Sequence, residues 1–279
     1  MKSAYKLYAF LFIGTLLFGC EVRLRNQNGG GLLGRASQDT SATLRISRSN
    51  NAANNPLNIT DSETRTSISS RVISPSSNLY EIVTPVGNMT VRLFDETPIH
   101  RDNFIKHVES GFYDGTTFHR IIGNFMIQGG DPNSKDGDPN NDGLCGPGYT
   151  NNPEISPSFF HKKGALAAAR QPDQVNPQRR SSGSQFFIVQ GRTYAAQEFE
   201  ELEKYVGSQI NNSNFQFRSE AIDAYTSIGG IPHLDMQYTV FGELVDGFDV
   251  LDRISAVPTD GRDRPIDNIT MSIRALPAQ

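Results

Sequence analysis

The sequence lacks the features that mark several classes of protein. It has two cysteines among 279 residues, too few for a disulfide framework. With 25 Gly, 15 Pro, 37% hydrophobic and 20% charged residues, its composition excludes a collagen, a coiled coil and a polytopic membrane protein. The net charge is only −4, so the chain as a whole has no excess of positive charge with which to bind the phosphates of a nucleic acid.

An apolar run near the start of the chain, Leu7–Phe18, follows two lysines. Its 12 residues are too few to cross a bilayer as a helix, which takes roughly 20, and the basic start is typical of an export signal. The run ends at Cys20 in a pattern that resembles the lipobox of bacterial lipoproteins, where the cysteine is diacylated and becomes the first residue of the mature protein. We therefore expect a signal peptide at residues 1–19 and a lipid on Cys20 that anchors the protein to a membrane outside the cytoplasm, at the periplasmic face or the cell surface.

Two alternatives to this interpretation remain, an ordinary cleaved signal and an uncleaved anchor with Cys20 incidental. If Cys20 carries a lipid, Cys145 is left without a disulfide partner, because the sequence contains no third cysteine.

The next segment, residues 20–78, is expected to be a disordered tether. Of the 58 residues Glu21–Asn78, 24 are Asn, Ser or Thr and none is aromatic. So few large apolar groups cannot offset the entropy of ordering the backbone. A flexible chain of this length spans on the order of 40 Å, which would hold a folded domain away from the membrane.

Residues 79–279 carry a net charge of −9, with 17 basic and 26 acidic side chains, and are expected to form one acidic, monomeric domain. Short apolar runs separated by Gly, Pro and Asn predict strands. The runs are Tyr80–Thr84, Met89–Phe94, Thr116–Ile122, Phe125–Gln128, Ala165–Ala169, Phe186–Val189, Tyr238–Leu244 and Ile269–Ile273.

Two helices are predicted beside these strands. One starts at Thr97-Pro98, presents Ile99, Phe104, Ile105 and Val108 on one face, and ends before Gly111. The other covers Gly247–Ala256. The long connection Ala195–Ile231 is expected to be an insertion with a helix at Ala195–Val206. This pattern indicates a mainly β protein, a closed barrel capped by two helices.

Four blocks of sequence resemble, in order, the cyclophilin family of peptidyl-prolyl isomerases. They are Phe118–Asp131 (FHRIIGNFMIQGGD), Gly164–Ala169 (GALAAA), Ser182–Val189 (SGSQFFIV) and Tyr238–Gly242 (YTVFG). The resemblance implies a closed eight-stranded antiparallel barrel with a shallow groove on its outer face. It also implies cis/trans exchange of X-Pro bonds in proline-containing polypeptides, without cofactor or metal.

The residue types support this chemistry on physical grounds. Twisting a prolyl amide breaks its resonance against a barrier near 18–20 kcal/mol and makes its nitrogen basic, so a fixed donor near that nitrogen favours the twisted state. Arg120 is the candidate donor, because its planar guanidinium stays charged. Gln128 is the candidate to orient Arg120 or to bind the substrate carbonyl. Without the motif, a salt bridge on a strand surface would be the simpler interpretation of Arg120.

An apolar cup for the proline ring is expected from Phe125, Met126, Phe187 and Leu234. Because successive side chains alternate along a strand, one of Phe186 and Phe187 must point away from the barrel core. The alternative is that both rings are buried beneath a covering loop.

The resemblance also implies a neighbouring channel for the residues before the proline, lined by Ala169, Arg170 and Gln185, whose backbone groups would pair with an extended peptide. His233 stands where many eukaryotic members have Trp, and Tyr238 where they have His. These differences put tight binding of cyclosporin in doubt.

Other sites are weaker candidates. Asp138–Gly143 matches the opening of a calcium-binding loop, but the twelfth position is Tyr149 instead of Glu, which favours a solvated turn. No Gly-x-Ser-x-Gly motif supports a hydrolase. Our interpretation is a membrane-tethered isomerase that assists the folding of exported proteins. The alternative is a non-catalytic binder of proline-containing segments. A third class, a structural envelope lipoprotein, is disfavoured because it would not need the set that includes Arg120 and Phe187.

Overall fold

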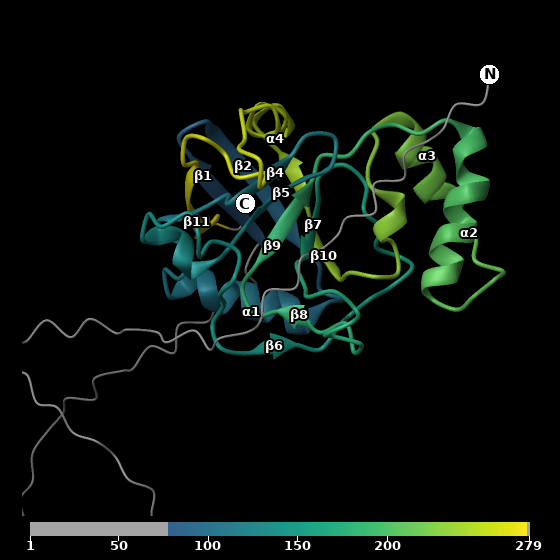
Figure 1. Ribbon diagram of the computed structural model, residues 1–279, viewed down its shortest axis with the longest axis horizontal. Coiled ribbons are helices and arrows are strands. Elements are labelled where there is room, and N and C mark those ends of the chain that lie inside the picture. The colour runs from purple at the N-terminus through teal and green to yellow at the C-terminus, as the bar shows by residue number, and fades with distance from the viewer. Residues whose placement is uncertain (1–77, 278–279) are drawn as a thin grey trace, which may run out of the picture. The chain divides into compact units, whose positions relative to one another are not determined.

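The computed structural model describes residues 78–277, drawn in colour in Figure 1. The predicted signal peptide, Cys20 and nearly all of the predicted tether lie outside these residues. Within the described part, no helix has the length and apolar character needed to cross a membrane.

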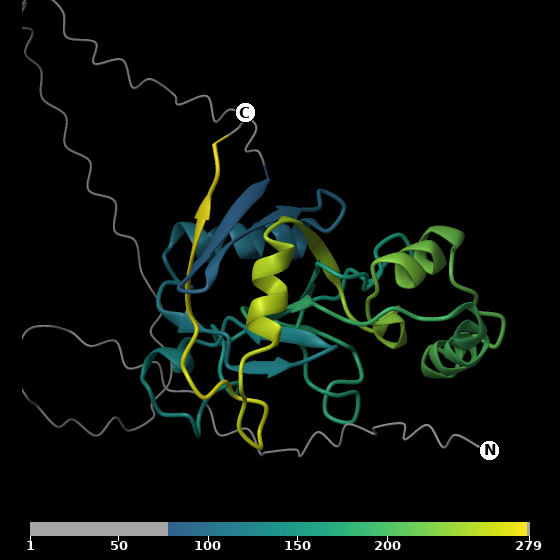
Figure 2. The same ribbon diagram turned by 90° about the horizontal axis from the view of Figure 1, so that it is seen from above.

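Nine of the described strands form one antiparallel sheet, in the order β3-β11-β1-β2-β10-β7-β9-β5-β4. They are β1 (Leu79–Thr84), β2 (Gly87–Leu93), β3 (Thr116–Thr117), β4 (Arg120–Ile122), β5 (Met126–Gly129), β7 (Ala165–Ala168), β9 (Phe186–Val189), β10 (Val240–Asp246) and β11 (Thr270–Ala275). Two further strands, β6 (Thr150–Asn151) and β8 (Ser181–Ser182), pair with each other. Figures 1 and 2 show how strongly the large sheet curls.

The two edges of this sheet, β3 and β4, are neighbours in the sequence. The run Thr116–Ile122, expected to be one strand, is broken after Thr117, where the Phe118 N–H donates to the carbonyl of Ile269 at 3.0 Å. Among the described residues no ladder joins β3 to β4. The protein is therefore mainly β with a half-barrel sheet, and closure into an eight-stranded barrel is not confirmed.

The main core fills the inner face of the sheet. Both expected helices pack there: α1 (Pro98–Glu109) contributes Phe104, and α4 (Phe248–Ser255) contributes Val250, Leu251 and Ile254. In Figure 1, α4 lies above the sheet and α1 below it.

Helix α1 begins where the sequence predicts, but a distant residue caps it. The Thr97 side chain makes no cap hydrogen bond. Instead, the Glu154 carboxylate accepts hydrogen bonds from the backbone N–H groups of Ile99 (3.0 Å) and His100 (2.9 Å). A carboxylate at this end satisfies donors that have no partner within the helix and interacts favourably with the helix dipole. The helix terminates at Gly111 as expected, with φ of +66°.

The buried face of α1 is more polar than predicted. Ile99 is 45% exposed, whereas His100 and His107 are buried. Both rings have polar partners: His100 Nδ1 lies 2.6 Å from the Glu154 carboxylate, and His107 Nε2 lies 2.8 Å from the carbonyl of Gly183. These partners allow histidine to occupy positions where the sequence pattern suggested only apolar side chains.

The connection after β9 forms a separate helical lobe beside the sheet, as both views show (Figures 1 and 2). The expected helix is present as a 3-10 turn, Ala196–Glu198, followed by α2 (Phe199–Gln209). A second helix, α3 (Ser219–Ser227), was not predicted. The lobe has its own core, formed by Tyr194, Phe199, Val206, Phe217, Ala221 and Tyr225.

This lobe leaves the sheet and returns to it at one place. The backbone N–H of Gly230 donates to the carbonyl of Arg192 at 2.9 Å, and the Arg192 N–H donates to the carbonyl of Gly230 at 3.3 Å. The two ends of the insertion are therefore held together by a backbone pair.

The role of Glu154 as a cap is testable. We expect Glu154→Ala to lower the free energy of unfolding by about 2 kcal/mol, because it removes the acceptor of two backbone donors and the partner of His100. Urea unfolding followed by circular dichroism measures the change. The matched control is Glu96→Ala, an exposed acid beside the same helix end, which should cost less than about 0.5 kcal/mol. Equal losses in the two variants would contradict the capping role.

Candidate active site

A row of four side chains crosses strands β4, β5, β9 and β7 on one face of the sheet. In the register, Arg120 lies opposite Gln128, Gln128 opposite Phe187, and Phe187 opposite Ala167. Directly paired residues of antiparallel strands share a face. Strand pairing therefore brings Arg120, Gln128 and Phe187 together although they are far apart in the sequence.

The two phenylalanines of β9 point to opposite faces, as predicted. Phe186 is part of the main core inside the sheet, and Phe187 belongs to a second apolar cluster on the outer face. Both side chains are nearly fully buried. The alternative, in which both rings are buried, is thus correct as to burial, and Phe187 is covered by other residues of its own cluster.

This second cluster contains the residues predicted for the proline cup. Met126, Ala169 and Phe187 are among its buried members, and Phe125, Leu234 and Tyr238 are partly buried against it. They come from the turn before β5, from β5 and β9, and from the segment around the 3-10 turn Pro232–Leu234. The structure thus brings together apolar side chains from several of the four sequence blocks and from the segment around Leu234.

The Phe187 ring is held between two other rings. His161 stacks on it with centroids 6.0 Å apart and an interplanar angle of 10°, and Tyr238 meets it edge-on at 5.8 Å. Asp235 fixes His161, because its carboxylate accepts hydrogen bonds from the His161 backbone N–H (2.9 Å) and lies 2.8 Å from the ring Nδ1. The other oxygen of Asp235 accepts a hydrogen bond from the Tyr225 hydroxyl at 2.7 Å.

His233 forms the adjoining wall. Its ring lies parallel to Phe125, with centroids 6.0 Å apart and an angle of 5°. Burial, together with the nearby His161, lowers the pKa of His233 to about 4, so the ring is neutral at pH 7. His233 is therefore an uncharged aromatic surface at the position where the resemblance placed Trp.

Arg120 is positioned by Asp263, a residue that no sequence motif singles out. Its Nε lies 3.6 Å from an oxygen of Asp263, and its side chain is 24% exposed. Gln128, the expected orienting residue, donates through Nε2 to Oε1 of Gln185 at 3.0 Å. Its amide is thus tied to the neighbouring strand end, on the side away from Arg120.

Gln185 also holds a neighbouring loop. Its Nε2 donates to the carbonyls of Cys145 (2.7 Å) and Gly143 (3.1 Å). The link from Gln128 through Gln185 therefore connects the row on the sheet to the loop that the sequence analysis considered for calcium.

The expected backbone pairing of a peptide with Ala169 is wrong in one respect. The Ala169 N–H donates to the carbonyl of Gln185 at 3.0 Å, and the Ser182 N–H donates to the carbonyl of Ala169 at 2.8 Å. These groups pair with each other inside the protein. Within residues 78–277, the backbone N–H and carbonyl of Arg170 have no such partner, so Arg170 is the position at which an added strand would find open groups.

The Arg170 side chain holds neighbouring residues in place. It is 3% exposed, donates from Nε to the carbonyl of Gln237 at 2.9 Å, and pairs with Asp173 at 2.5 Å. Its guanidinium lies 4.5 Å from the centroid of the Tyr238 ring, a cation–π distance. Burial raises the pKa of Tyr238, which keeps its phenol neutral at pH 7.

Several residues of this site were missed by sequence reasoning. His161, Asp235 and Asp263 act on predicted residues from neighbouring loops, and a single sequence offers no motif for any of them. For His161 and Asp235, a weak signal was their closeness in sequence to the blocks Gly164–Ala169 and Tyr238–Gly242. Nothing of that kind points to Asp263.

The acidic loop shows the features of a turn. Asp138 accepts hydrogen bonds from the backbone and side chain of Asn140, and Asp142 pairs with Arg264 at 2.8 Å. Glu154 lies outside this loop and caps α1. Among the described residues, no group of three or more His, Cys, Asp or Glu side chains is placed to hold a metal ion.

The prediction that Cys145 lacks a partner applies if Cys20 carries a lipid, and Cys20 lies outside the described residues. The Cys145 side chain is 7% exposed. A reactive thiol at this position is therefore not part of the site.

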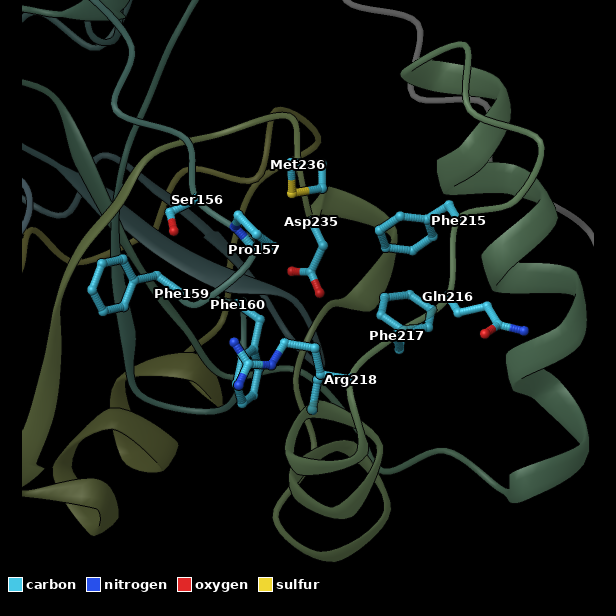
Figure 3. A pocket seen from close by; sticks show the side chains of 11 residues that line it. Ser156, Pro157, Phe159, Phe160, Phe215, Gln216, Phe217, Arg218, Asp235 and Met236 are labelled. Atoms are coloured by element: carbon cyan, nitrogen blue, oxygen red, sulfur yellow. The ribbon is translucent and has the colours of Figure 1, made fainter.

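A separate cavity of about 30 Å³ lies between the helical lobe and the segment Ser156–Phe160 (Figure 3). Phe159, Phe160, Phe215 and Phe217 line it, and Asp235 stands at one side. A cavity of this size holds one or two water molecules. None of the predicted site residues lines it, so it belongs to the packing of the lobe.

Comparisons with known proteins agree with one another. Residues 79–274 match the family model described as cyclophilin type peptidyl-prolyl cis-trans isomerase/CLD. A protein of Staphylococcus saprophyticus, named among the peptidyl-prolyl cis-trans isomerases, is 35% identical over 189 residues, which cover 66% of this chain and 84% of that protein. A similarly named protein of Staphylococcus aureus strain COL is 34% identical over 186 residues, with the same two coverages.

Solved structures give the same result. The crystal structure of a cyclophilin type peptidyl-prolyl cis-trans isomerase of Cryptosporidium parvum superposes with a TM-score of 0.53 at 26% identity, covering 72% of this chain and 99% of that chain. A second crystal structure of it, in the presence of the dipeptide Ala-Pro, gives a TM-score of 0.51.

The buried histidines predict a loss of stability in mild acid. Burial lowers the pKa of His100, His107, His119 and His233, in the last two to about 4. An unfolded chain binds protons at these positions near pH 6.5, so the unfolded state gains protons first as the pH falls and stability decreases.

Between pH 7.5 and 5.5, His119 and His233 should each contribute a loss on the order of 1 kcal/mol. Urea midpoints followed by circular dichroism at the two pH values measure the effect. His233→Phe keeps a ring against Phe125 and removes one titrating group, so it should lose less stability over the same interval. A midpoint independent of pH in the unmodified protein would refute the argument.

Proposed function

The chain belongs to the cyclophilin-type peptidyl-prolyl cis-trans isomerases, and we propose that it exercises this activity on exported polypeptides, as a monomer held at a membrane by a lipid on Cys20. We place the reaction at the row Arg120–Gln128–Phe187. This row lies beside the apolar cluster on the outer face of the sheet. It puts a permanent cation next to a surface suited to a proline ring.

In the proposed mechanism, apolar residues bind the proline ring and a different residue stabilises the twisted amide. Phe125, Met126, Phe187 and Leu234 hold the proline ring, which offers only CH₂ surface. As the amide twists, its nitrogen loses conjugation and becomes basic, and Arg120 donates a hydrogen bond to it. The bond is stronger in the twisted state than in the planar one, so it lowers the barrier of about 18–20 kcal/mol.

No proton transfer is required in this mechanism. Arg120 stays charged at any physiological pH. His233 is neutral because its pKa is about 4, and burial keeps the pKa of Tyr238 above its ordinary value. The groups around the cup therefore hold one charge state near neutral pH.

The direction of the peptide follows from strand register together with the family resemblance. We place the residues before the proline near Ala169 and Gln185, and those after it near Phe125. β5 and β9 are antiparallel, with Gly129 opposite Phe186, which puts Gln185 and Phe125 at opposite ends of the groove.

The role of Arg120 is tested by exchange spectroscopy on a prolyl peptide. Arg120→Ala should lower the catalysed exchange rate at least tenfold, equivalent to about 1.4 kcal/mol of barrier, and leave peptide affinity within a few-fold. Arg274→Ala, which removes an exposed arginine on β11, is the matched control and should keep full activity. Full activity in Arg120→Ala would show that another group is the donor.

Phe187→Ala should behave differently from Arg120→Ala. It removes surface used by the planar and twisted states alike, so it should weaken binding as well as turnover. If the unmodified protein binds prolyl peptides yet gives no exchange above the spontaneous rate of tens of seconds or slower, the non-catalytic binder is the correct function for this chain.

The membrane anchor is supported by sequence alone. The pattern of residues 1–20 favours a lipidated Cys20, and a tether with a net charge of +3, from seven basic and four acidic residues in Glu21–Asn78, precedes a domain of −9. Because the chain has two cysteines, a lipid on Cys20 and a disulfide of Cys145 within one chain exclude each other.

In a bacterial host, Cys20→Ser should abolish lipid labelling and move the protein from the membrane to the soluble fraction, because the acyl chains supply the anchor. Cys145→Ser is the matched control and should keep both the label and the membrane location. Retention of Cys20→Ser at the membrane would favour an uncleaved helix or a protein partner as the anchor.

A further inference from the structure

The helical lobe reaches the groove at the end where the residues after the proline are placed. Helix α2 packs against the 3-10 turn Pro232–Leu234, which carries His233 and Leu234. His233 in turn stacks on Phe125. The insertion therefore stands beside the Phe125 end of the groove, opposite Gln185.

One side chain of the lobe touches the site directly. The Tyr205 ring of α2 meets the His233 ring edge-on, with centroids 6.5 Å apart and an angle of 75°. Tyr205 thus lies beside His233, one of the positions where this chain departs from the family pattern.

Tyr205 is exposed and yet firmly placed. It is 37% exposed, whereas Val206, the next residue, is fully buried in the lobe core. The lobe itself is tied to the site through the hydrogen bond from the Tyr225 hydroxyl to Asp235. Arg179 also donates to the carbonyl of Gln209 at the end of α2 (2.7 Å) and to that of Met236 (3.2 Å). A ring held in this way loses little entropy when a ligand binds it.

Phe125, His233 and Tyr205 form a continuous run of rings that leads away from the proline cup. The ring-to-ring spacings are 6.0 and 6.5 Å. An extended peptide advances about 3.4 Å per residue, so the two spacings together cover at most about four residues. The His233 ring is unprotonated at neutral pH, because its pKa is lowered to about 4.

We propose that Tyr205 is a substrate-binding residue that lengthens the groove, and that it binds an aromatic or large aliphatic side chain two or three residues after the proline. This inference rests on the proposed function, since it takes the direction of the peptide from it. The lobe would thereby act as a specificity element: a neutral aromatic surface favours a large apolar side chain.

Two peptides test this proposal on the full chain. They share one X-Pro bond and differ only in having Phe or Gly at the second and third positions after the proline. Exchange spectroscopy gives kcat and KM for each, and calorimetric titration gives Kd. We expect the unmodified protein to bind the Phe peptide five- to tenfold more tightly than the Gly peptide, with kcat within twofold.

Tyr205→Ala should reduce this preference to less than twofold by raising KM for the Phe peptide, while KM for the Gly peptide and both kcat values stay unchanged. Tyr205→Phe should retain the preference because it retains the ring. Phe248→Ala, which removes a ring of similar exposure (36%) from α4, is the matched control and should also retain it.

A Tyr205→Ala protein that keeps the full preference for Phe overturns the proposal, and so does an unmodified protein that binds the two peptides equally. If the unmodified protein gives no exchange but prefers the Phe peptide in titration, and Tyr205→Ala removes that preference, the isomerase function fails while the role of Tyr205 in binding stands. The two failures are therefore distinguishable.

Discussion

The site depends on the antiparallel pairing of β4, β5 and β9. That pairing sets Arg120 opposite Gln128 and Gln128 opposite Phe187, and it directs Phe186 to the inner core. A slip of one residue would exchange the two faces of a strand. It would bury Gln128 inside the sheet and remove the cation from the proline cup, so core packing and site geometry are specified by the same register.

Asp235 joins the lobe to a residue that backs Phe187. One oxygen binds His161, whose ring backs Phe187, and the other binds Tyr225 of the lobe. The carboxylate is 5% exposed. A buried carboxylate needs such partners to offset its desolvation, and in meeting that need it fixes the lobe and one wall of the cup relative to each other.

Sequence reasoning succeeded where information is local. Alternation along β9 separated Phe186 from Phe187, and Thr97-Pro98 and Gly111 marked the two ends of α1. It failed where a partner is distant in sequence. The cap of α1 comes from Glu154, and the Ala169 N–H is used by Gln185.

The broken run Thr116–Ile122 has a similar cause. Its composition suits one strand, but the chain changes partner there: Thr116 and Thr117 pair with β11, whereas Arg120–Ile122 pair with β5. The lobe was underestimated for another reason: α3 lies in a connection whose polar surface residues obscure the few buried ones, Ala221 and Tyr225. Tertiary contacts of this kind leave no pattern in a single sequence.

The backbone pair between Arg192 and Gly230 brings the two ends of the insertion together, so that the insertion is a separable segment of the chain. A chain without the residues between them would need only a tight turn at that place, and the ladder positions of β9 and β10 would stay as they are. The helices beyond this junction are thus free to vary in length and surface from one relative to another. Tyr225 is the exception, because its hydroxyl is a partner of the buried Asp235 and so couples the lobe to the residues around Phe187.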